Sequence, residues 1–182
     1  MIYEKTLCGK YVYLHSADID DAEFTLSIRK NPELMKYMPI LDITIDQQRA
    51  WIESQRKQVN DYFFVVRNNL NQPIGTVSLY NMQEKTAESG RLVLIGNALE
   101  NAEAVLLLFR FGFQYLQLER IQGRVYVNNK RAIRFNSLFG CVNGELGQHY
   151  NGQMIYKTLI TSESFAMAEK RIVRILYPEK DV

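Results

Sequence analysis

The chain has 182 residues, 47% of them hydrophobic, which is typical of one compact domain with its own core. Its 22 Lys and Arg residues nearly balance 20 Asp and Glu residues, so the sequence lacks the basic excess of nucleic-acid-binding proteins. Two histidines and two widely separated cysteines give no zinc-site spacing, and no apolar run approaches the ~20 residues that span a bilayer. We therefore expect a cytoplasmic domain with no metal and no nucleic-acid or membrane partner.

The N-terminal half of the sequence predicts alternating strands and helices. Apolar alternation and apolar helical periodicity predict, in order, strand 10–15, helix 18–30, helix 44–59, strand 61–67 and strand 74–80. The segment 29–39 between the two helices, RKNPELMKYMP, either lines a pocket or covers the core. Trp51, the single tryptophan, is expected to be a packing anchor.

A strand–helix–strand–helix unit forms the centre of the chain. A strand at 87–95 leads into a helix that is apolar on almost all sides and has one polar stripe, which includes Glu103. A strand at 120–127 and a helix at 130–139 follow. The loop after the first of these strands is a place where ligand phosphates often bind, because the amides and the dipole of a helix start favour an anion.

Five short strings stand in an order that is specific, although each is common by itself. They are RKNPEL at 29–34, PIG at 73–75, AESG at 87–90, FxxLxLERI at 113–121, and NxxAI with LFG at 129–140. In this order the strings resemble the GNAT superfamily of acyl-CoA-dependent N-acetyltransferases. The resemblance is greatest to the branch with ribosomal-protein N-terminal and nucleotide-amino-sugar acetyltransferases, and it covers roughly residues 10–161.

The resemblance implies an α+β fold, with one GNAT-like domain over residues 1–182 and a helix at about 162–176 as a C-terminal extension. The central sheet is expected to be mixed but mostly antiparallel, with splayed middle strands and flanking helices. A late hairpin turns at Asn151-Gly152, a strong hairpin signal. This hairpin and the C-terminal helix are candidate surfaces for a homodimer.

The resemblance also implies acetyl-CoA as a cosubstrate and no metal. The pantetheine arm is expected between the splayed strands, bound like an added strand to the backbone of Leu92, Val93 and Leu94. The pyrophosphate is expected at the start of the following helix, and the last helix of the unit is expected to form the far wall. The corresponding residues are Asn97, Asn101 and Ala102 for the pyrophosphate, and Asn129 and Ala132 for the far wall.

The loop before the long helix departs from the glycine-rich pattern of the family. It reads GNALENAE from Gly96, its single glycine, and Asn97-x-x-Glu100 is typical of a capping box that starts a helix. A carboxylate ~4 Å from a pyrophosphate charge costs on the order of 4 kcal/mol at an effective dielectric near 20. Glu100 and Glu103 therefore either point away from this place, or weaken cosubstrate binding, or abolish it.

Acetyl transfer to an amine needs a group that removes a proton from nitrogen. Glu88 is the candidate base, alone or through water, and the alternative is an exposed carboxylate at a strand end. A regular strand would place Glu88 on the same side as Leu92 and Leu94. A strand amide near Val93 or Leu94 is the candidate donor to the oxyanion.

The leaving thiolate needs a proton. Many family members have a tyrosine where this chain has Asn136, which can donate a hydrogen bond but cannot act as an acid. Tyr126, on the preceding strand, is the candidate substitute. Tyr80 and His15 are weaker candidates for a catalytic role.

The sequence thus predicts an acetyl-CoA-dependent N-acetyltransferase that moves an acetyl group directly to a primary amine. The acceptor is a small molecule, an amino sugar or a protein N-terminus, and the residues do not separate these. The alternative is a GNAT-like acyl-CoA-binding or regulatory domain without transferase activity. The glycine-poor loop and the absent tyrosine are the observations that motivate this alternative.

Overall fold

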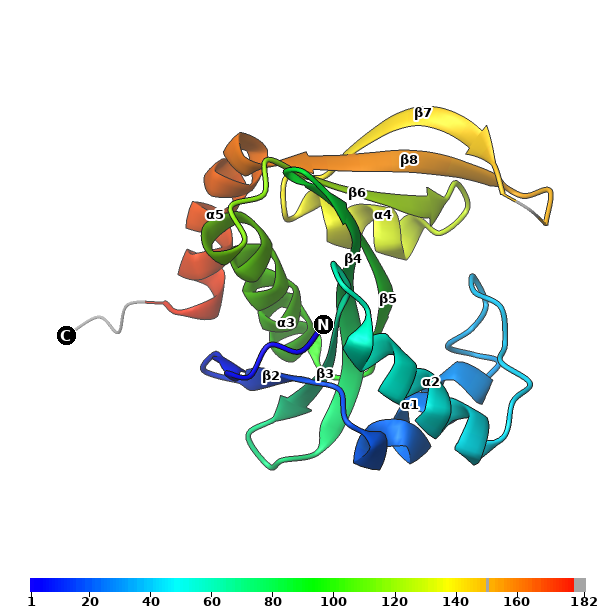
Figure 1. Cartoon of the computed structure of the whole chain (residues 1–182). Coiled ribbons are helices and arrows are strands. Elements are labelled where there is room, and N and C mark those ends of the chain that lie inside the picture. The colour runs from blue at the N-terminus through cyan, green and yellow to red at the C-terminus, as the bar shows by residue number, and fades with distance from the viewer. Residues whose placement is uncertain (150, 179–182) are drawn as a thin grey trace.

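The computed structural model describes residues 1–149 and 151–178. They form one eight-stranded sheet in the order β1-β2-β3-β4-β5-β6-β8-β7, in which β5 and β6 pair in parallel and all other neighbours are antiparallel. Helices α3 and α5 lie on one side of the central strands, and α1 and α2 lie on the other (Figure 1). The expected α+β fold, with a mixed but mostly antiparallel sheet, is confirmed.

The strands are β1 (Leu7–Cys8), β2 (Val12–Ser16), β3 (Tyr62–Asn68), β4 (Pro73–Gln83), β5 (Thr86–Leu94), β6 (Arg120–Tyr126), β7 (Val142–Gln148) and β8 (Met154–Thr161). The helices are α1 (Ala22–Lys30), α2 (Ile45–Lys57), α3 (Ala98–Arg110), α4 (Lys130–Ser137) and α5 (Ser162–Leu176). Within the described ranges, none of these helices has the length and apolar character needed to cross a bilayer.

Helix α3 is the centre of the main core, as its apolar sequence predicts. Its residues 104–109 are all buried and pack with β-strand residues and with α5. Glu103 is also fully buried, so it does not belong to an exposed polar stripe. Its carboxylate accepts hydrogen bonds from the amides of Lys10, Tyr11 and Val12 and from the Tyr177 hydroxyl. Glu103 therefore fastens both ends of the described chain to α3.

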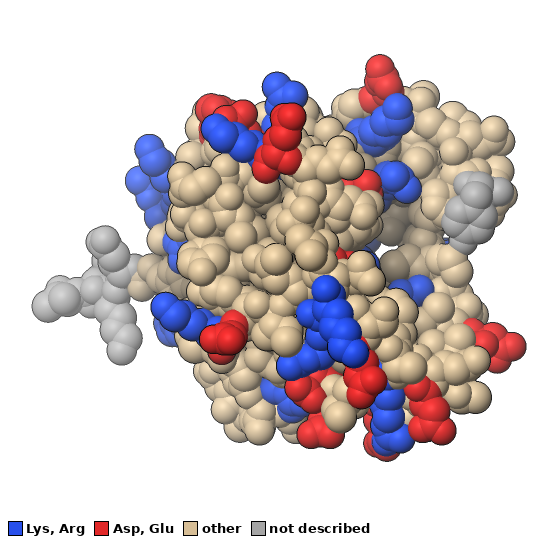
Figure 2. All heavy atoms as spheres, viewed as in Figure 1, with Lys and Arg blue, Asp and Glu red and all other residues tan. Residues whose placement is uncertain are grey.

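Strands β5 and β6 pair only over their first residues. The paired residues are 86–88 on β5 and 120–122 on β6, and the strands separate beyond them. The expected splay is confirmed, and it opens a cleft between the two strands. The edge of β5 that faces this cleft has no neighbouring strand after Glu88. Figure 2 shows a hollow on this side of the molecule, between the late hairpin β7–β8 and the segment before α2, with Lys or Arg atoms at its edges.

Strand β5 contains a bulge that its sequence pattern does not indicate. Thr76 pairs with Val93 and Ser78 pairs with Gly90, so two residues of β5 stand opposite one residue of β4. Leu92 and Leu94 contact the main core, whereas Val93 packs with residues of α1 and the following segment. The regular alternation expected for β5 is therefore wrong, and Glu88 does not share a face with Leu92 and Leu94.

Candidate active site

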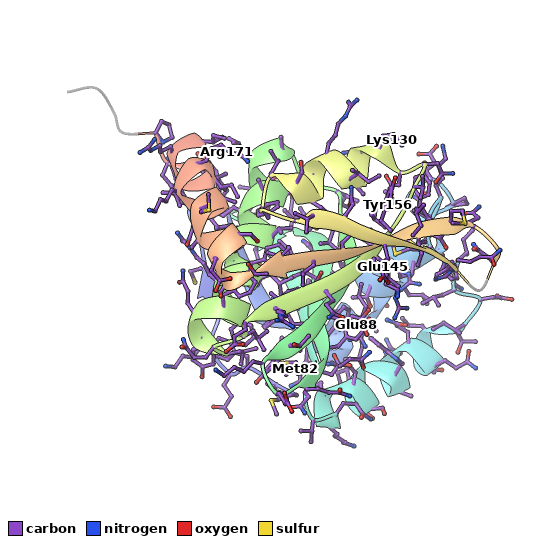
Figure 3. The ribbon with its side chains drawn as sticks, turned by 90° about the horizontal axis from the view of Figure 1, so that it is seen from above. Met82, Glu88, Lys130, Glu145, Tyr156 and Arg171 are labelled. Atoms are coloured by element: carbon purple, nitrogen blue, oxygen red, sulfur yellow. The ribbon has the colours of Figure 1, made fainter. Side chains whose placement is uncertain are left out.

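The closed end of the cleft contains an open pocket of about 740 Å³. Three parts of the fold line it: the corner between α2 and β3, the end of hairpin β4–β5, and Gln122 of β6. Met82 and Glu88, which both line the pocket, lie near each other at the end of this hairpin (Figure 3). The volume falls within the range of ~300–1,000 Å³ that small-molecule sites occupy.

Carboxamides, which both donate and accept hydrogen bonds, are the most frequent side chains in the lining of this pocket. Its carboxamides are Gln58, Asn60, Asn81, Gln83 and Gln122. Its carboxylates are Asp61, Glu84 and Glu88, and the described lining residues include no Lys or Arg. Such a lining suits a polar amine, because the carboxylates attract an ammonium group and the carboxamides match hydroxyls.

Glu88 is the pocket carboxylate that lies where β5 and β6 separate. It is the last residue of β5 that pairs with β6, and its side chain is 25% exposed. Asn81 Nδ2 donates to Glu88 Oε1 at 3.2 Å, and Arg124 Nη2 lies 3.6 Å from Oε2. Asp61 is instead held by a two-point ion pair with Arg91. Glu88 thus has two partners, of which Arg124 is the more distant, and its role as a base stays a prediction.

Tyr80 stands directly opposite Glu88 on β4 and faces the bulge of β5. A β-carbon at Gly90 would lie only 2.6 Å from the Tyr80 hydroxyl oxygen, so glycine makes room for this hydroxyl. Burial, together with the nearby Glu88 carboxylate, raises the pKa of Tyr80. The hydroxyl is therefore protonated at neutral pH and can donate a hydrogen bond or a proton.

Tyr126 is the last residue of β6 and lies towards the open end of the cleft, four residues beyond the last β6 residue that pairs with β5. At ~3.3 Å per residue, this offset along the strand is roughly 13 Å. Its hydroxyl contacts His149 Nδ1 at 3.0 Å and accepts from Asn151 Nδ2 at 3.2 Å, and its ring lies 5.9 Å from that of Tyr37. The fold therefore does not bring Tyr126 and Glu88 together.

The segment between α1 and α2 reaches across to this far wall. Residues 36–39 line a second, smaller pocket of about 120 Å³ together with Tyr126, and the Tyr37 hydroxyl donates to the Asn128 carbonyl at 3.4 Å. Met35 of the same segment is buried against α1. The two roles expected for this segment, covering the core and lining a pocket, are both present.

The residues expected to hold the pantetheine arm are placed for backbone contacts only. Leu92 and Leu94 direct their side chains to the main core, and Val93 packs with Ile28 and Met35. The pairing of β5 with β6 ends at Glu88, so the cleft-side backbone of residues 89–94 has no strand partner. An extended ligand could pair with that backbone as an added strand.

The start of α3 forms the capping box that the sequence predicts. Asn97 Oδ1 accepts from the amides of Leu99 and Glu100 at 2.9 and 3.0 Å, and the Glu100 carboxylate accepts from the Asn97 amide at 2.8 Å. Asn101 Nδ2 donates to the Gly96 carbonyl at 2.7 Å. Side chains of this helix start thus occupy the amides of Asn97, Leu99 and Glu100, which lie in the region expected for pyrophosphate. Of the two glutamates in question, Glu103 points away and Glu100 remains at this position.

The other predicted residues lie on α4 or on the far strands. Asn129 caps α4 by accepting from the Ala132 amide at 3.1 Å, and Asn136 lies half-buried in the last turn of that helix. His15 lies on β2, three strands from β5, where its ring is 2.9 Å from the Asp21 carboxylate. His15 is therefore remote from the cleft. No group of His, Cys, Asp or Glu within the described residues could hold a metal ion.

Comparisons with known proteins point to one family. Residues 12–142 match the family model described as "Acetyltransferase (GNAT) domain". A curated relative, the "Uncharacterized N-acetyltransferase p20" of Bacillus licheniformis, is 30% identical over 148 residues, which cover 74% of this chain and 81% of the relative. Both matches are sequence matches, and each covers more of the chain than the central strand–helix–strand–helix unit.

Solved structures share the whole fold at low sequence identity. "Apo FdhC- a nucleotide-linked sugar GNAT" superposes with a TM-score of 0.81 and 22% identity, over 97% of this chain and 99% of that one. The spermidine N-acetyltransferase of Vibrio cholerae, solved with CoA and spermine, gives a TM-score of 0.77 and 17% identity, over 87% and 99% of the two chains. At such identities the likeness shows a common fold.

Proposed function

We propose, since this chain belongs to the GNAT superfamily of N-acetyltransferases, that it transfers an acetyl group from acetyl-CoA directly to the primary amine of a small polar acceptor. The observation that carries the proposal is the pocket at the closed end of the cleft, in which Glu88 lies among carboxamides. An amino sugar is the acceptor class that this lining favours, because carboxamides pair with adjacent hydroxyls. The fold is also that of a nucleotide-linked sugar GNAT.

In this proposal, acetyl-CoA enters the space between β5 and β6. The free edge of β5 after Glu88 binds its pantetheine arm through backbone groups of residues 92–94, and an amide of the same edge donates to the thioester oxygen as it gains negative charge. Asn129 and Ala132 at the start of α4 form the far wall. The pyrophosphate competes with Glu100 at the start of α3, so Asn97, Asn101 and Ala102 bind it only after that carboxylate moves.

The acceptor nitrogen must lose a proton before and during its attack, because an alkyl ammonium has a pKa near 10.4. Glu88 takes this proton, directly or through a water molecule, and passes it to solvent. Asn81 and Arg124 fix the orientation of its carboxylate. The nitrogen then forms its bond to the acetyl carbon, and the bond between that carbon and sulfur breaks.

The departing thiolate takes a proton from a hydroxyl near the bulge, and the second proton that the nitrogen loses on becoming an amide returns to that hydroxyl oxygen through solvent. Tyr80 suits this role better than Tyr126, because its hydroxyl lies over Gly90 on the strand that borders the cleft, whereas Tyr126 is committed to His149 and Asn151. Asn136 remains a candidate hydrogen-bond donor from α4. The set proposed for catalysis is therefore Glu88 and Tyr80, with Tyr126 closing the cleft through Tyr37.

The amides at the start of α3 already bind side chains of the same helix start. This observation favours a second candidate function, that of a domain that binds acyl-CoA weakly or not at all and transfers nothing. A direct test uses the purified chain with acetyl-CoA and three separate acceptors: glucosamine, spermidine and a tripeptide with a free N-terminus. We expect CoA thiol release with glucosamine in clear excess over the other two. A true binder should also be stabilised by ~2.7 kcal/mol at a hundred times the dissociation constant.

The outcomes separate the two candidates. Release of thiol with an equal amount of acetylated glucosamine by mass spectrometry supports the enzyme. A rise in melting temperature without acetylation of any acceptor supports the binding domain. Neither stabilisation nor acetylation at millimolar acetyl-CoA would contradict the enzyme and support a domain that no longer binds acyl-CoA. Faster acetylation of spermidine or the tripeptide would overturn only the preference for an amino sugar.

A further inference from the structure

Arg91 has a backbone conformation that arginine rarely adopts. It lies in the bulge of β5 with φ +47°, in the left-handed region. Among the described non-glycine residues with positive φ, only Asn81 and Arg91 lie inside strands, and asparagine tolerates this region far better than arginine does. Such a conformation persists only where the surrounding structure holds it.

The first set of contacts that holds this backbone conformation is made by the side chain of Arg91 with Asp61. Its Nη1 and Nη2 atoms donate to the two oxygens of Asp61 at 2.6 and 2.8 Å, and both side chains are mostly buried. A two-point guanidinium–carboxylate pair fixes direction as well as distance. The Thr76 hydroxyl donates to the Arg91 carbonyl at 2.7 Å, which fixes the backbone from the neighbouring strand.

Aromatic rings supply the second set of contacts. The centre of the guanidinium lies 4.7 Å from the ring of Tyr80 and 5.3 Å from the ring of Trp51, and Phe63 is 5.9 Å away. These residues belong to β4, α2 and β3, and Asp61 immediately precedes β3. The guanidinium of Arg91 therefore joins the bulge to three neighbouring elements at once.

The bulge decides which side chains of β5 face the acceptor pocket. Because strand side chains alternate, a shift of the bulge by one residue would move the intervening side chain to the other face. The present position directs Leu92 and Leu94 to the core and leaves Glu88 in the pocket opposite Tyr80. The same position sets where the free backbone edge of residues 92–94 begins.

We propose that Arg91 is a positioning residue for acetyl transfer, acting through Asp61, Tyr80 and Trp51 to hold the bulge that aligns the backbone edge of β5 with Glu88. The inference rests on the proposed function, because it concerns the alignment of that same site. It assigns Arg91 no contact with the acceptor or with acetyl-CoA. Its loss should therefore slow transfer far more than it weakens the binding of either substrate.

Arg91→Gly tests the proposal, because glycine adopts the left-handed backbone freely while the guanidinium is removed. We expect kcat to fall about a hundredfold, the loss that a misplacement of about 1 Å produces, with KM for glucosamine and the acetyl-CoA dissociation constant within about threefold of wild type. Methylguanidinium at millimolar concentration should restore part of kcat by filling the space beside Asp61. Fluorescence of Trp51, the single tryptophan, should change in the variant and return during the same titration.

A matched control is available on the other side of the sheet. Arg110 Nε donates to Glu169 at 2.6 Å, and the exposed fractions of these side chains, 34% and 18%, resemble those of Arg91 and Asp61, 25% and 15%. Arg91→Lys and Arg110→Lys each keep the charge and lose the fork of donors. We expect Arg91→Lys to lower kcat at least tenfold and Arg110→Lys to leave kcat and Trp51 emission unchanged.

Unchanged kcat in Arg91→Gly and Arg91→Lys, in a wild type that acetylates glucosamine, would overturn the inference and leave the proposed function intact. A loss of kcat that matches the unfolded fraction, or that methylguanidinium does not relieve, would also overturn it, because Arg91 would then serve stability alone. A wild type without acetylation of any acceptor would instead contradict the proposed function. In that case, Trp51 fluorescence during the titration of Arg91→Gly with methylguanidinium still tests whether the guanidinium holds the bulge.

Discussion

The bulge of β5 and the start of α3 lie at opposite ends of one short stretch of chain. The polar groups of the bulge have partners far away in the sequence, whereas those of the helix start have partners within the same turn. Arg91 depends on Asp61, Trp51 and Tyr80, which come from three other places in the sequence. Asn97 and Glu100 satisfy the amides of their own helix start within a single turn. The side of the cleft proposed for the acceptor is thus fixed by tertiary contacts, whereas the side expected to meet pyrophosphate is closed by local ones.

This difference separates two properties of the site. In our proposal, alignment at Glu88 depends on the contacts of Arg91, which a single substitution disrupts and which a ligand does not need to rearrange. Binding at the start of α3 depends on a local arrangement that a ligand must displace, since the helix amides already have acceptors. We therefore expect substitutions near β5 to change kcat and substitutions at the start of α3 to change the affinity for acetyl-CoA.

The largest expected effect is that of Glu88→Gln, which removes the base and keeps the shape of the side chain. kcat for glucosamine should fall by ~10²-fold or more, because general base catalysis contributes that much, while the acetyl-CoA dissociation constant stays the same. Steady-state kinetics combined with a thermal-shift titration measure both quantities. Glu84→Gln removes a second carboxylate of the same pocket and should raise KM while kcat stays nearly unchanged; equal losses of kcat in both variants would argue against a specific role for Glu88.

The second prediction compares two glutamates of α3. Glu103→Gln should lower the free energy of unfolding by ~2–3 kcal/mol, because a buried acceptor of four hydrogen bonds is replaced by a group that also donates. Glu100→Gln, at the exposed cap, should cost less than ~1 kcal/mol. Urea unfolding of both variants tests the contrast, and a larger loss for Glu100→Gln would reverse the roles assigned to them.

The affinity for acetyl-CoA gives the third prediction. Glu100→Gln should tighten binding about tenfold, because the carboxylate that competes with the pyrophosphate loses its charge, and the gain should shrink at high salt. Isothermal titration with acetyl-CoA at two salt concentrations measures it. Weaker binding by the variant would mean that Glu100 assists the cosubstrate rather than opposing it.

The two tyrosines give a fourth prediction. Tyr80→Phe should lower kcat about tenfold by removing the hydroxyl at the bulge, whereas Tyr126→Phe should mainly raise KM, because its hydroxyl holds His149 and Asn151 near the cleft mouth. Steady-state kinetics of both variants measure the split. If Tyr126→Phe lowers kcat and Tyr80→Phe does not, the proton donor is Tyr126, as the sequence first indicated.

The smallest expected effect is the pH dependence of stability at Asp21, which lies outside both the bulge of β5 and the start of α3. Burial alone would raise the pKa of Asp21, but hydrogen bonds from His15, the Asp18 amide and Arg67 lower it below its usual value. The stabilisation is therefore present above the unfolded pKa of ~3.9 and is lost as pH falls through the folded pKa. The stability gap between wild type and Asp21→Asn should narrow below about pH 4, and a gap that widens would contradict this sign.

The parts of the fold that the sequence predicted are those with local causes. The capping box at Asn97 precedes α3 as expected, and the apolar pattern of α3 indicated its central place. The splay of β5 and β6 followed from the family resemblance. The short strand β1 was not predicted, because two residues at 7–8 leave no alternation to recognise.

The parts of the site that the sequence did not reveal have causes far away in the chain. Arg91 looked like an ordinary strand residue because its partner Asp61 lies thirty positions earlier, so the bulge gave no local signal. Glu103 looked like part of a surface stripe because its amide partners belong to residues 10–12. The offset of Tyr126 from Glu88 depends on where β5 and β6 separate, which a sequence does not specify residue by residue.

The most direct test of the central claim is a crystal structure of the protein soaked with CoA and glucosamine. We expect the pantetheine arm along the free edge of β5 at residues 92–94, the Glu100 carboxylate displaced from the Asn97 amide, and the sugar amine within hydrogen-bond reach of Glu88. Ligand density elsewhere, with the space between β5 and β6 empty and the capping box intact, would contradict it.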